Sequence, residues 1–338
     1  MVTLKDIAKE AGCSLTTVSI IANGRGDEMH ISAGTQQRIK KLIDEMGYRP
    51  NRSAQFLRSK APAHPVIAFY WPLDSRANLL GARLIRFQDA LSELDPACEI
   101  VVQTFICGKL SLYLDPLYEN RYSGAIIAGA NEEDMVSLES LELPIPVPTV
   151  LMNLQSRKYS TVGINNNNIG ARAAALIHSK GYKSCALVKS SELHGGTSQR
   201  TKAFLYNCRQ LGIDVPEEYC FSSMPGIEGG AKATEEYCAL TERPRVIYYE
   251  NDSMAQGGIY TLQRFGLKVP VDVEVLCIEM RESESTEYLM PPVSSISIPP
   301  NVEKQTIALL LKLLKGSETS PVHIEMEPIV HLKESFSL

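Results

Sequence analysis

The sequence lacks the features that would place it in a membrane or outside the cell. Its longest apolar stretches, such as residues 307–311, are far shorter than the roughly 20 residues that a membrane-spanning helix needs. No apolar run follows a basic start at the N-terminus, so the sequence predicts no secretory signal. The eight cysteines include no Cys-x-x-Cys pair, which favours reduced thiols over a disulfide framework. We therefore expect a cytoplasmic protein that is not attached to a membrane.

Motifs of catalysis and metal binding are also missing. The chain has no Gly-x-Ser-x-Gly elbow, no Walker phosphate loop and no Gly-x-Gly-x-x-Gly fingerprint. The run His194-Gly195-Gly196 is similar to a lipase oxyanion loop, but no nucleophile motif accompanies it. The six histidines show no metal-ligand spacing. The sequence thus argues against an enzyme and predicts neither a metal nor another cofactor.

What the chain does have is length and an uneven distribution of charge. Its 338 residues, 44% of them hydrophobic and 22% charged, are typical of two or three globular units. Residues 1–60 hold ten basic and six acidic side chains, a net charge of +4, whereas the whole chain carries −5. A basic head on an acidic body suggests a polyanionic partner for the head, although an uneven surface without a partner would look the same.

The basic head has the pattern of three short helices. Thr3 can cap a helix that starts at Leu4 and ends at Gly12, with Asp6 completing a capping box. After a tight turn, Ser14 can cap a second helix, and Ser32 can cap a third. Apolar residues recur at helical spacing, namely Leu4, Ile7, Ala8, Ala11, then Val18, Ile21, Ala22, then Ile39, Leu42, Ile43, Met46. This arrangement is typical of a helix-turn-helix domain.

A specific signature runs through the same residues. It comprises residues 2–14, Thr17-Val18-Ser19, Asn23, Ile31-Ser32, Thr35, Arg38-Ile39 and Gly47-Tyr48-Arg49-Pro50-Asn51. With these residues the head resembles the lactose-repressor (LacI/GalR) family of transcriptional regulators. One departure is the loop at residues 24–30, which is a few residues longer than in the best-known members. The resemblance implies a homodimer that binds double-stranded, pseudo-palindromic operator DNA.

In such repressors the second helix enters the major groove, so the resemblance implies that Leu15, Thr16 and Ile20 read bases. Ile20 could contact a thymine methyl group, or it could instead pack against the third helix. Other expected DNA-binding residues of the head are Thr3, Lys5, Ser14, Thr17, Asn23, Arg25, Tyr48 and Asn51.

A hinge is expected at residues 49–62, between the helix-turn-helix domain at 1–48 and a body at 63–338. The segment is too short to be stably helical alone in water. The resemblance implies that it folds on DNA, where Leu57 wedges into a minor-groove step. Ala54 would allow close approach, and Arg58 would contact phosphate. Leu57 could alternatively serve as ordinary linker or core packing.

From residue 65 onward, short apolar strands alternate with amphipathic helices. Strand starts lie 22–35 residues apart in two similar runs, which is typical of β-α-β units with a parallel sheet. The expected strands are Val66–Trp71, Glu99–Phe105, Ala125–Ala128, Val147–Met152, Ser184–Val188, Tyr219–Ser222, Val246–Tyr249 and Val273–Ile278. The predicted fold is therefore an all-α head plus an α/β body of two Rossmann-like lobes. The body resembles periplasmic binding proteins, with the chain crossing between lobes near 162–166 and 291–296.

A small effector is expected between the lobes, at the C-terminal ends of the strands. The resemblance implies that Arg200 and Asp252 hold its polar groups, often sugar hydroxyls. Asp252 could instead cap the helix that begins at Ser253, and Arg200 could be a surface cation. Less specific candidates are Arg76, Asn78, Asn166, His194 and Met224. The Gly-aromatic-Asp of the family is here Cys277-Ile278-Glu279, which leaves the effector class open.

Together these features predict a sequence-specific DNA-binding regulator of the LacI type, a repressor controlled by a sugar or sugar derivative. Either sign of control, release from DNA or tighter binding, is compatible with the sequence. The competing interpretations are an enzyme and a solute-binding protein with an accessory helical head. Salt-dependent binding to duplex DNA separates the regulator from both.

Overall fold

The computed structural model describes residues 3–22, 26–27, 29–46, 64–119, 121–192, 195–279, 284–319 and 321–337. The expected hinge at residues 49–62 lies outside this range, and so do Asn23, Arg25 and Tyr48. Within the described part, no helix is both long enough and apolar enough to cross a membrane. All eight cysteines are described, and each is a free thiol.

Three helices form the head: α1 (Leu4–Ala11), α2 (Leu15–Ala22) and α3 (Ala33–Glu45). The predicted capping box is confirmed, because the Asp6 backbone N–H donates to Thr3 Oγ1 and the Thr3 N–H donates to Asp6 Oδ2. Gly12 ends α1 in the left-handed conformation with φ of 60°, which a residue without Cβ adopts at little cost. The apolar faces meet in a small core around Ile7, Val18, Ile21 and Ile39. The helix-turn-helix prediction is thus confirmed.

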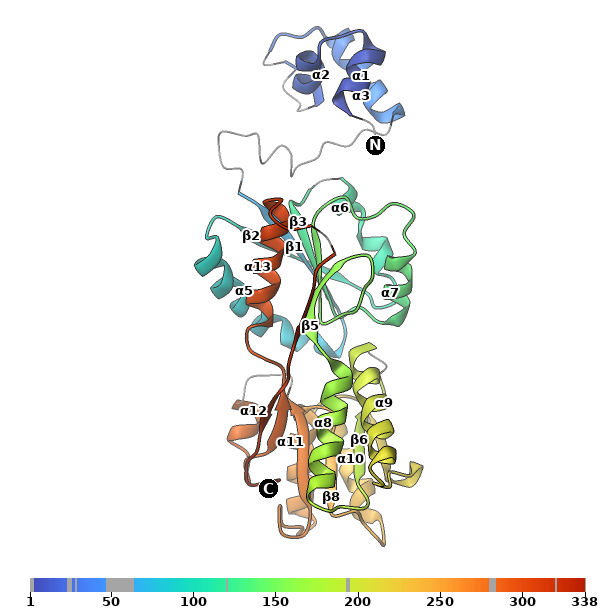
Figure 1. Cartoon of the computed structure of the whole chain (residues 1–338), viewed down its shortest axis with the longest axis vertical. Helices are drawn as coiled ribbons and strands as arrows, with labels where there is room; N and C mark the ends of the chain where they lie inside the picture. Colours follow the sequence, from blue (N-terminus) through green and yellow to red (C-terminus); the bar gives the residue numbers. More distant parts are fainter. Residues whose placement is uncertain are drawn as a thin grey trace.

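The body consists of two lobes, each built on a six-stranded sheet (Figure 1). The first sheet has the order β11-β5-β4-β3-β1-β2 and is parallel throughout. Its strands are β1 (Val66–Pro72), β2 (Glu99–Phe105), β3 (Gly124–Ala128), β4 (Thr149–Met152), β5 (Ser160–Ile164) and β11 (His323–Met326). On one face lie α5 (Leu80–Leu94) and α13 (Val302–Leu314), and on the other α6 (Asp115–Tyr118) and α7 (Glu132–Glu139). Two 3₁₀ turns, η1 (Ser75–Leu79) and η2 (Leu110–Tyr113), follow β1 and β2.

The second sheet repeats this plan with the order β12-β10-β9-β8-β6-β7, in which only β12 is antiparallel to its neighbour. Its strands are β6 (Ala186–Ser190), β7 (Cys220–Ser223), β8 (Val246–Tyr249), β9 (Glu274–Glu279), β10 (Ser294–Ser297) and β12 (Ile329–His331). Its helices are α8 (Asn166–Ser179), α9 (Gly195–Gln210), α10 (Ile227–Ala239), α11 (Asp252–Arg264) and α12 (Glu284–Glu287), with a 3₁₀ turn η3 (Glu217–Tyr219).

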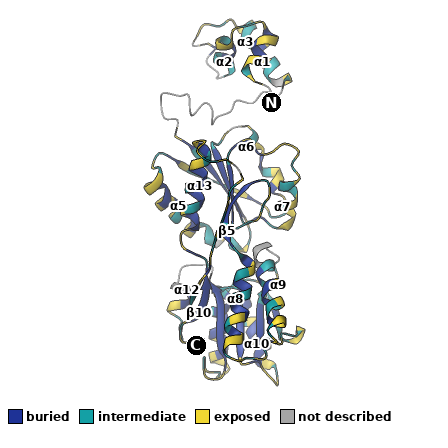
Figure 2. Cartoon of the chain, in the orientation of Figure 1, coloured by how far each residue is buried: buried dark blue, intermediate teal, exposed yellow. Residues whose placement is uncertain are grey.

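Each sheet is buried on both faces, as parallel sheets are (Figure 2). In the second lobe, α8 and α9 cover a core that contains Phe204 and Tyr248, while α10 and α11 cover the opposite face around Tyr237 and Tyr249. The near-continuous apolar strands of the sequence follow from this double burial. The predicted α/β body of two Rossmann-like lobes is confirmed.

The chain passes between the lobes three times. It crosses after β5, after β10 at residues 298–301, and after β11 at residues 327–328. The second crossing therefore follows the expected segment 291–296, which contains the first three residues of β10, and the sequence predicted no third crossing. At the third crossing Glu327 accepts hydrogen bonds from Asn168 and Arg172 of α8, at 2.6 and 2.9 Å.

All eight predicted strands are present within two residues of their expected bounds, but β5, β10, β11 and β12 were missed. These four are short, and their polar residues hide the strand pattern. In β10, for example, the buried Ser294 hydroxyl lies between the carbonyls of Lys333 and Phe336. Hydrogen bonds inside the fold thus allow a polar sequence to form a buried strand.

Candidate functional site

The first turn of α2 presents the side chains that the sequence analysis assigned to base reading. Leu15 is 43% exposed, although it is a large apolar residue, and Thr16 is also exposed. Ile20, one turn later, is half-buried and takes no part in the core cluster of the head. Half-burial fits both alternatives for Ile20, contact with a thymine methyl group and packing against the third helix, so both stay predictions.

Other predicted residues of the head lie at the starts of α1 and α2. The Ser14 hydroxyl accepts from the Thr17 N–H at 3.0 Å and lies 2.8 Å from the Thr17 hydroxyl, so both residues build the start of α2. Thr3 caps α1, and Lys5 is exposed on it. The remaining predicted DNA contacts lie outside the described residues: Asn23, Arg25, Tyr48, Asn51, Ala54, Leu57 and Arg58.

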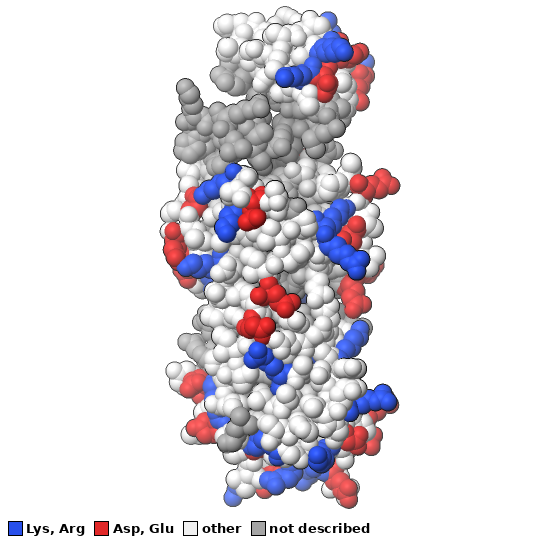
Figure 3. Space-filling view, viewed as in Figure 1, with Lys and Arg blue, Asp and Glu red and all other residues white. Residues whose placement is uncertain are grey.

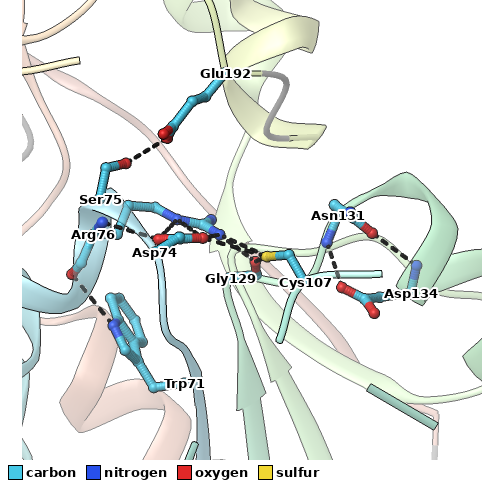
Figure 4. Close-up of polar contacts among 9 residues, drawn as sticks. All are labelled: Trp71, Asp74, Ser75, Arg76, Cys107, Gly129, Asn131, Asp134 and Glu192. Atoms are coloured by element: carbon cyan, nitrogen blue, oxygen red, sulfur yellow. Dashed lines mark hydrogen bonds and ion pairs between the residues drawn. The ribbon is translucent and has the colours of Figure 1, made fainter. Parts of the chain in front are cut away.

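In each sheet of the body there is one pair of neighbouring strands whose connections lead to opposite faces of the sheet. Open α/β sheets bind ligands at the carboxyl ends of such a pair, which is called a switch point. In the first lobe this switch point lies between β1 and β3, and Arg76 fills it (Figure 4). The Arg76 guanidinium pairs with Asp74 at 2.5 Å and donates to the Gly129 carbonyl at 2.8 Å and to Cys107 Sγ at 3.3 Å. Arg76 is therefore held by the chain itself rather than extended into solvent.

The electrostatics of this cluster follow from its geometry. Burial alone would raise the pKa of Asp74, but hydrogen bonds from the Arg76 side chain and backbone, together with its charge, lower that pKa to about 2. Burial raises the pKa of Cys107 to about 12, so its thiol stays protonated. The cluster contributes one fixed ion pair with no net charge.

In the second lobe the switch point lies between β6 and β8, and Glu250 fills it. Glu250 directly follows β8 and is 4% exposed. One carboxylate oxygen accepts from the Ser190 N–H at the end of β6, at 2.6 Å, and the other accepts from the Thr201 hydroxyl on α9. Burial raises the pKa of Glu250, against the lowering effects of these two hydrogen bonds and of Arg200 and Lys189.

Arg200 lies beside Glu250 and is equally buried, so the alternative of a surface cation is wrong. Its Nε donates to Asn166 Oδ1 at 2.8 Å, which joins the second turn of α9 to the first residue of α8. Burial lowers the pKa of the guanidinium, and the nearby Tyr248 and Glu250 oppose that shift. Tyr248 packs on Phe204 with ring centroids 4.3 Å apart, and its buried hydroxyl has no hydrogen-bond partner among the residues that the structure describes.

Asp252 is the first residue of α11 and is buried. The cap of that helix is Asn251, whose side chain accepts from the Met254 N–H at 2.8 Å, so the capping alternative for Asp252 is wrong. Glu279, at the end of β9, is also buried and accepts from the hydroxyls of Thr286 and Ser295 at 2.7 and 2.9 Å.

The two switch points are joined by a hydrogen bond between the lobes. The Ser75 hydroxyl, at the start of η1, donates to Glu192, which follows β6, at 2.5 Å (Figure 4). We call the polar residues that follow the strands or lie in the first turns of the helices on either side of this bond the interlobe site, and they are Asp74, Ser75, Arg76, Asn166, Glu192, Arg200, Glu250 and Asp252. Among the predicted residues, a hydrogen bond joins Asn166 to Arg200, whereas Arg76 follows β1 and Asp252 follows β8.

The remaining predictions for the effector are less informative. Met224 is 59% exposed and lies 3.6 Å from the Ser191 hydroxyl. His194 and the Asn78 side chain lie outside the described residues. Sequence reasoning missed Glu250, Glu192 and Tyr248, of which Glu250 had a usable signal because it directly follows a predicted strand.

The rest of the described surface has fewer features that indicate a functional site. Acidic and basic side chains are scattered over the body on the face in Figure 3, without a large patch of one sign. Among the described residues no group of three His, Cys, Asp or Glu side chains could hold a metal ion. The interlobe site and the exposed turn of α2 are therefore the two regions that we consider for function.

Two family models match separate parts of the chain. Residues 3–51 match the family described as "Bacterial regulatory proteins, lacI family", and residues 156–336 match the "Periplasmic binding protein-like domain". The probable HTH-type transcriptional repressor ExuR of Bacillus subtilis (strain 168) is 26% identical over 93% of this chain and 91% of its own length.

Two solved structures share the fold over nearly the whole chain. The lac repressor dimer bound to operator and the anti-inducer ONPF gives a TM-score of 0.69 at 20% identity, covering 100% of this chain and 99% of that one. A complex of the transcriptional regulator CelR with cellobiose gives a TM-score of 0.68 at 20% identity, covering 99% of this chain and 100% of that one.

Proposed function

Because the chain belongs to the lacI family of bacterial regulatory proteins, we propose that it is a transcriptional repressor that binds operator DNA and responds to a small molecule. Its relatives in this family are named transcriptional repressors, so the enzyme alternative is dropped. A solute-binding protein would have no use for the helix-turn-helix head. We further propose a cytoplasmic location, where the DNA is and where eight thiols stay reduced.

The exposed first turn of α2 carries the DNA-binding part of the proposal. An apolar side chain as large as Leu15 gains nothing from exposure to water, but it can contact a thymine methyl group in the major groove. Thr16 beside it can donate to or accept from a base edge. Ile20 extends the same surface by one turn. We assign contacts with DNA bases to these three residues, and contacts with the sugar-phosphate backbone of the DNA to Thr3, Lys5, Ser14 and Thr17.

Homodimerisation follows from the same proposal. The lac repressor structure that shares this fold is a dimer on its operator. Two heads related by a two-fold axis read two half-sites of a pseudo-palindrome. We propose that residues 49–62 form the hinge between a head at 1–48 and a body at 63–338, with Leu57 inserted into a minor-groove step.

The interlobe site carries the effector part of the proposal. Residues from both lobes meet there at the C-terminal ends of parallel strands, where α/β proteins bind ligands. Guanidinium, amide and carboxylate groups suit the hydroxyls of a sugar, and the CelR structure of the same fold holds cellobiose. A ligand that binds more tightly to one of two conformations, which differ in the angle between the lobes, would shift the dimer toward that conformation. If the two conformations differ in DNA affinity, the ligand changes DNA binding.

Selection of duplexes from a random pool, followed by titration of the selected duplex at several salt concentrations, tests the DNA-binding part. We expect recovery of a pseudo-palindrome and a steep fall of log affinity with log salt. The double variant Leu15→Ala, Thr16→Ala should lose specificity for that duplex but keep non-specific binding. Gln37→Ala, which changes an exposed residue of α3, serves as the matched control. Equal affinity of the wild type for selected and random duplexes would contradict the proposal.

A further inference from the structure

A hydrogen bond between the lobes lies far from the segments where the chain crosses. The Ser75 hydroxyl, at the start of η1, donates to the Glu192 carboxylate at 2.5 Å (Figure 4). Ser75 follows β1, which lies three strands from β5 in the first sheet, and Glu192 follows β6, which lies three strands from β10 in the second. The crossings leave from β5, β10 and β11. The bond therefore joins the lobes on the side of the sheets away from the crossings.

The distance from the crossings makes this bond sensitive to the angle between the lobes. Neighbouring strands are about 4.8 Å apart, so three strands place the bond roughly 14 Å from the crossings. A rotation of roughly 10° at that radius moves its two ends apart by roughly 2 Å, and a hydrogen bond is lost beyond about 3.5 Å. Bonds at the crossings, such as that from Asn168 to Glu327 at 2.6 Å, lie close to the axis of such a rotation and lengthen less.

In the first lobe, Ser75 lies on a turn that side chains hold in place. Asp74 caps this turn by accepting from the Arg76 N–H at 2.9 Å. The Arg76 side chain pairs with Asp74 and donates to the Gly129 carbonyl at 2.8 Å, which connects the turn to the end of β3. The Trp71 indole donates to the Arg76 carbonyl at 3.3 Å. Ser75 is therefore expected to move together with the first lobe.

In the second lobe, hydrogen bonds also hold the backbone around Glu192. The Ser191 N–H donates to the Ser223 carbonyl of β7 at 2.8 Å, and the Ser190 N–H donates to Glu250 at 2.6 Å. The Glu192 N–H donates to the Ser190 hydroxyl at 3.0 Å. Both partners of the bond between the lobes are thus fixed within their own lobes, so a change of the lobe angle stretches the bond itself.

We propose that the hydrogen bond from Ser75 to Glu192 is a latch that stabilises the angle between the lobes in this structure. A polyhydroxyl ligand whose hydroxyl donates to Glu192 would replace the Ser75 hydroxyl and release the latch. This release rests on the proposed effector function of the interlobe site, whereas the latch itself can be measured without ligand or DNA. The net contribution of one hydrogen bond shifts an equilibrium about three- to tenfold, so the latch changes the ratio of closed to open lobes without locking them.

Single-molecule energy transfer in the full chain measures the ratio of open to closed lobes. One dye is placed on Leu112 of η2, which is 73% exposed and follows β2, and the other on the exposed Glu218 of η3, which precedes β7. Unnatural amino acids carry the dyes, so that the native thiols stay unlabelled, and labelled chains are diluted with unlabelled ones. Ser75→Ala removes the latch and leaves the other contacts of Glu192 in place. We expect it to raise the ratio of open to closed lobes about three- to tenfold.

Further variants separate the latch from a local disturbance. Ser75→Thr keeps the hydroxyl and should restore most of the wild-type ratio. Ser92→Ala changes an exposed serine of α5 in the same lobe and should leave the ratio unchanged. In the double variant Ser75→Ala, Glu192→Ala the ratio should not exceed that of Glu192→Ala alone, because both changes remove the same bond. The fluorescence of Trp71, the one tryptophan of the chain, shows whether the turn around Ser75 keeps its structure.

The outcomes distinguish the latch from the proposed function. An S75A protein with the wild-type ratio would overturn the latch, and so would a double variant whose change in the ratio is the product of the two single changes. Titration of the wild type with glucose, galactose and cellobiose, each checked for a rise in melting temperature, tests the release. A sugar that binds without raising the open fraction would overturn the release. A chain that no sugar stabilises would contradict the carbohydrate effector and with it the release, whereas the latch is decided by the ratio without ligand.

Discussion

Gly170 is a point of close approach between α8 and α9. A Cβ atom added there would lie 2.4 Å from the Arg200 carbonyl oxygen, 2.5 Å from the Phe204 nitrogen and 2.9 Å from the Ala203 Cβ. Two of these atoms are backbone and cannot rotate away. Gly170→Ala must therefore push α8 and α9 apart.

Separating the helices lowers the free energy of unfolding, and the higher helix propensity of alanine offsets part of this loss. Overpacking typically costs about 1–3 kcal/mol, and we take the upper end because the contacts are with backbone. Alanine regains about 1 kcal/mol of helix propensity. The net loss is about 2 kcal/mol, which for a lobe of this size lowers the melting temperature by roughly 4–8 °C. Because Arg200 moves with α9, effector affinity should fall as well.

Gly81 offers a matched control, since it lies near the start of α5 and nothing lies within 4 Å of an added Cβ. Gly81→Ala should raise stability by about 0.5–1 kcal/mol. Calorimetric melting of both variants, with circular dichroism to check the fold, makes the comparison. A G170A protein that melts at or above the wild type would refute the argument from helix contact.

Three further predictions concern separate parts of the chain. The pKa of Asp74 is about 2 in the folded protein and 3.8 when unfolded, so the ionised side chain stabilises the fold above pH 4 and this contribution is lost as the pH falls toward 2. The difference in melting temperature between the wild type and Asp74→Asn should therefore become smaller from pH 5 to pH 3. Arg83→Leu leaves the buried Glu303 without its nearest partner and should cost about 3–5 kcal/mol in denaturant unfolding, whereas the double variant with Glu303→Leu should recover most of it. Leu57→Gly should weaken operator binding far more than non-specific binding and reduce DNA bending on permuted fragments; unchanged bending would assign Leu57 to packing.

The fold was predictable where buried positions give the sequence a recognisable pattern of apolar residues. Strands such as β1 (Val66–Pro72) are apolar because helices cover both faces of the sheet, and the helices of the head have the caps and apolar stripes that are typical of helices. The strands at the crossings were not predictable in this way. Buried Ser294 and Ser295 look like loop residues in the sequence, because their partners lie at residues 333–336 and at Glu279.

The site was predictable only in part, for a similar reason. Family resemblance led to Arg200 and Asp252, and the structure removes the simpler roles that the sequence left open for them. No sequence pattern could show that Glu250 meets Ser190, since that contact depends on β8 lying beside β6. Which side chains meet at the site therefore depends on the strand order of the fold.

The third crossing determines the order in which the chain can fold. Phe336 is fully buried among Leu276 and Ile296, and Ser335 bonds the backbone of Val275, so the second lobe is complete only with its last residues. The sheet of the first lobe is likewise complete only when β11 pairs with β5. The head, in contrast, is complete within residues 3–46. During synthesis from the N-terminus, a folded head would therefore emerge long before its body, and the unfinished sheets would expose apolar strands to chaperones in the meantime.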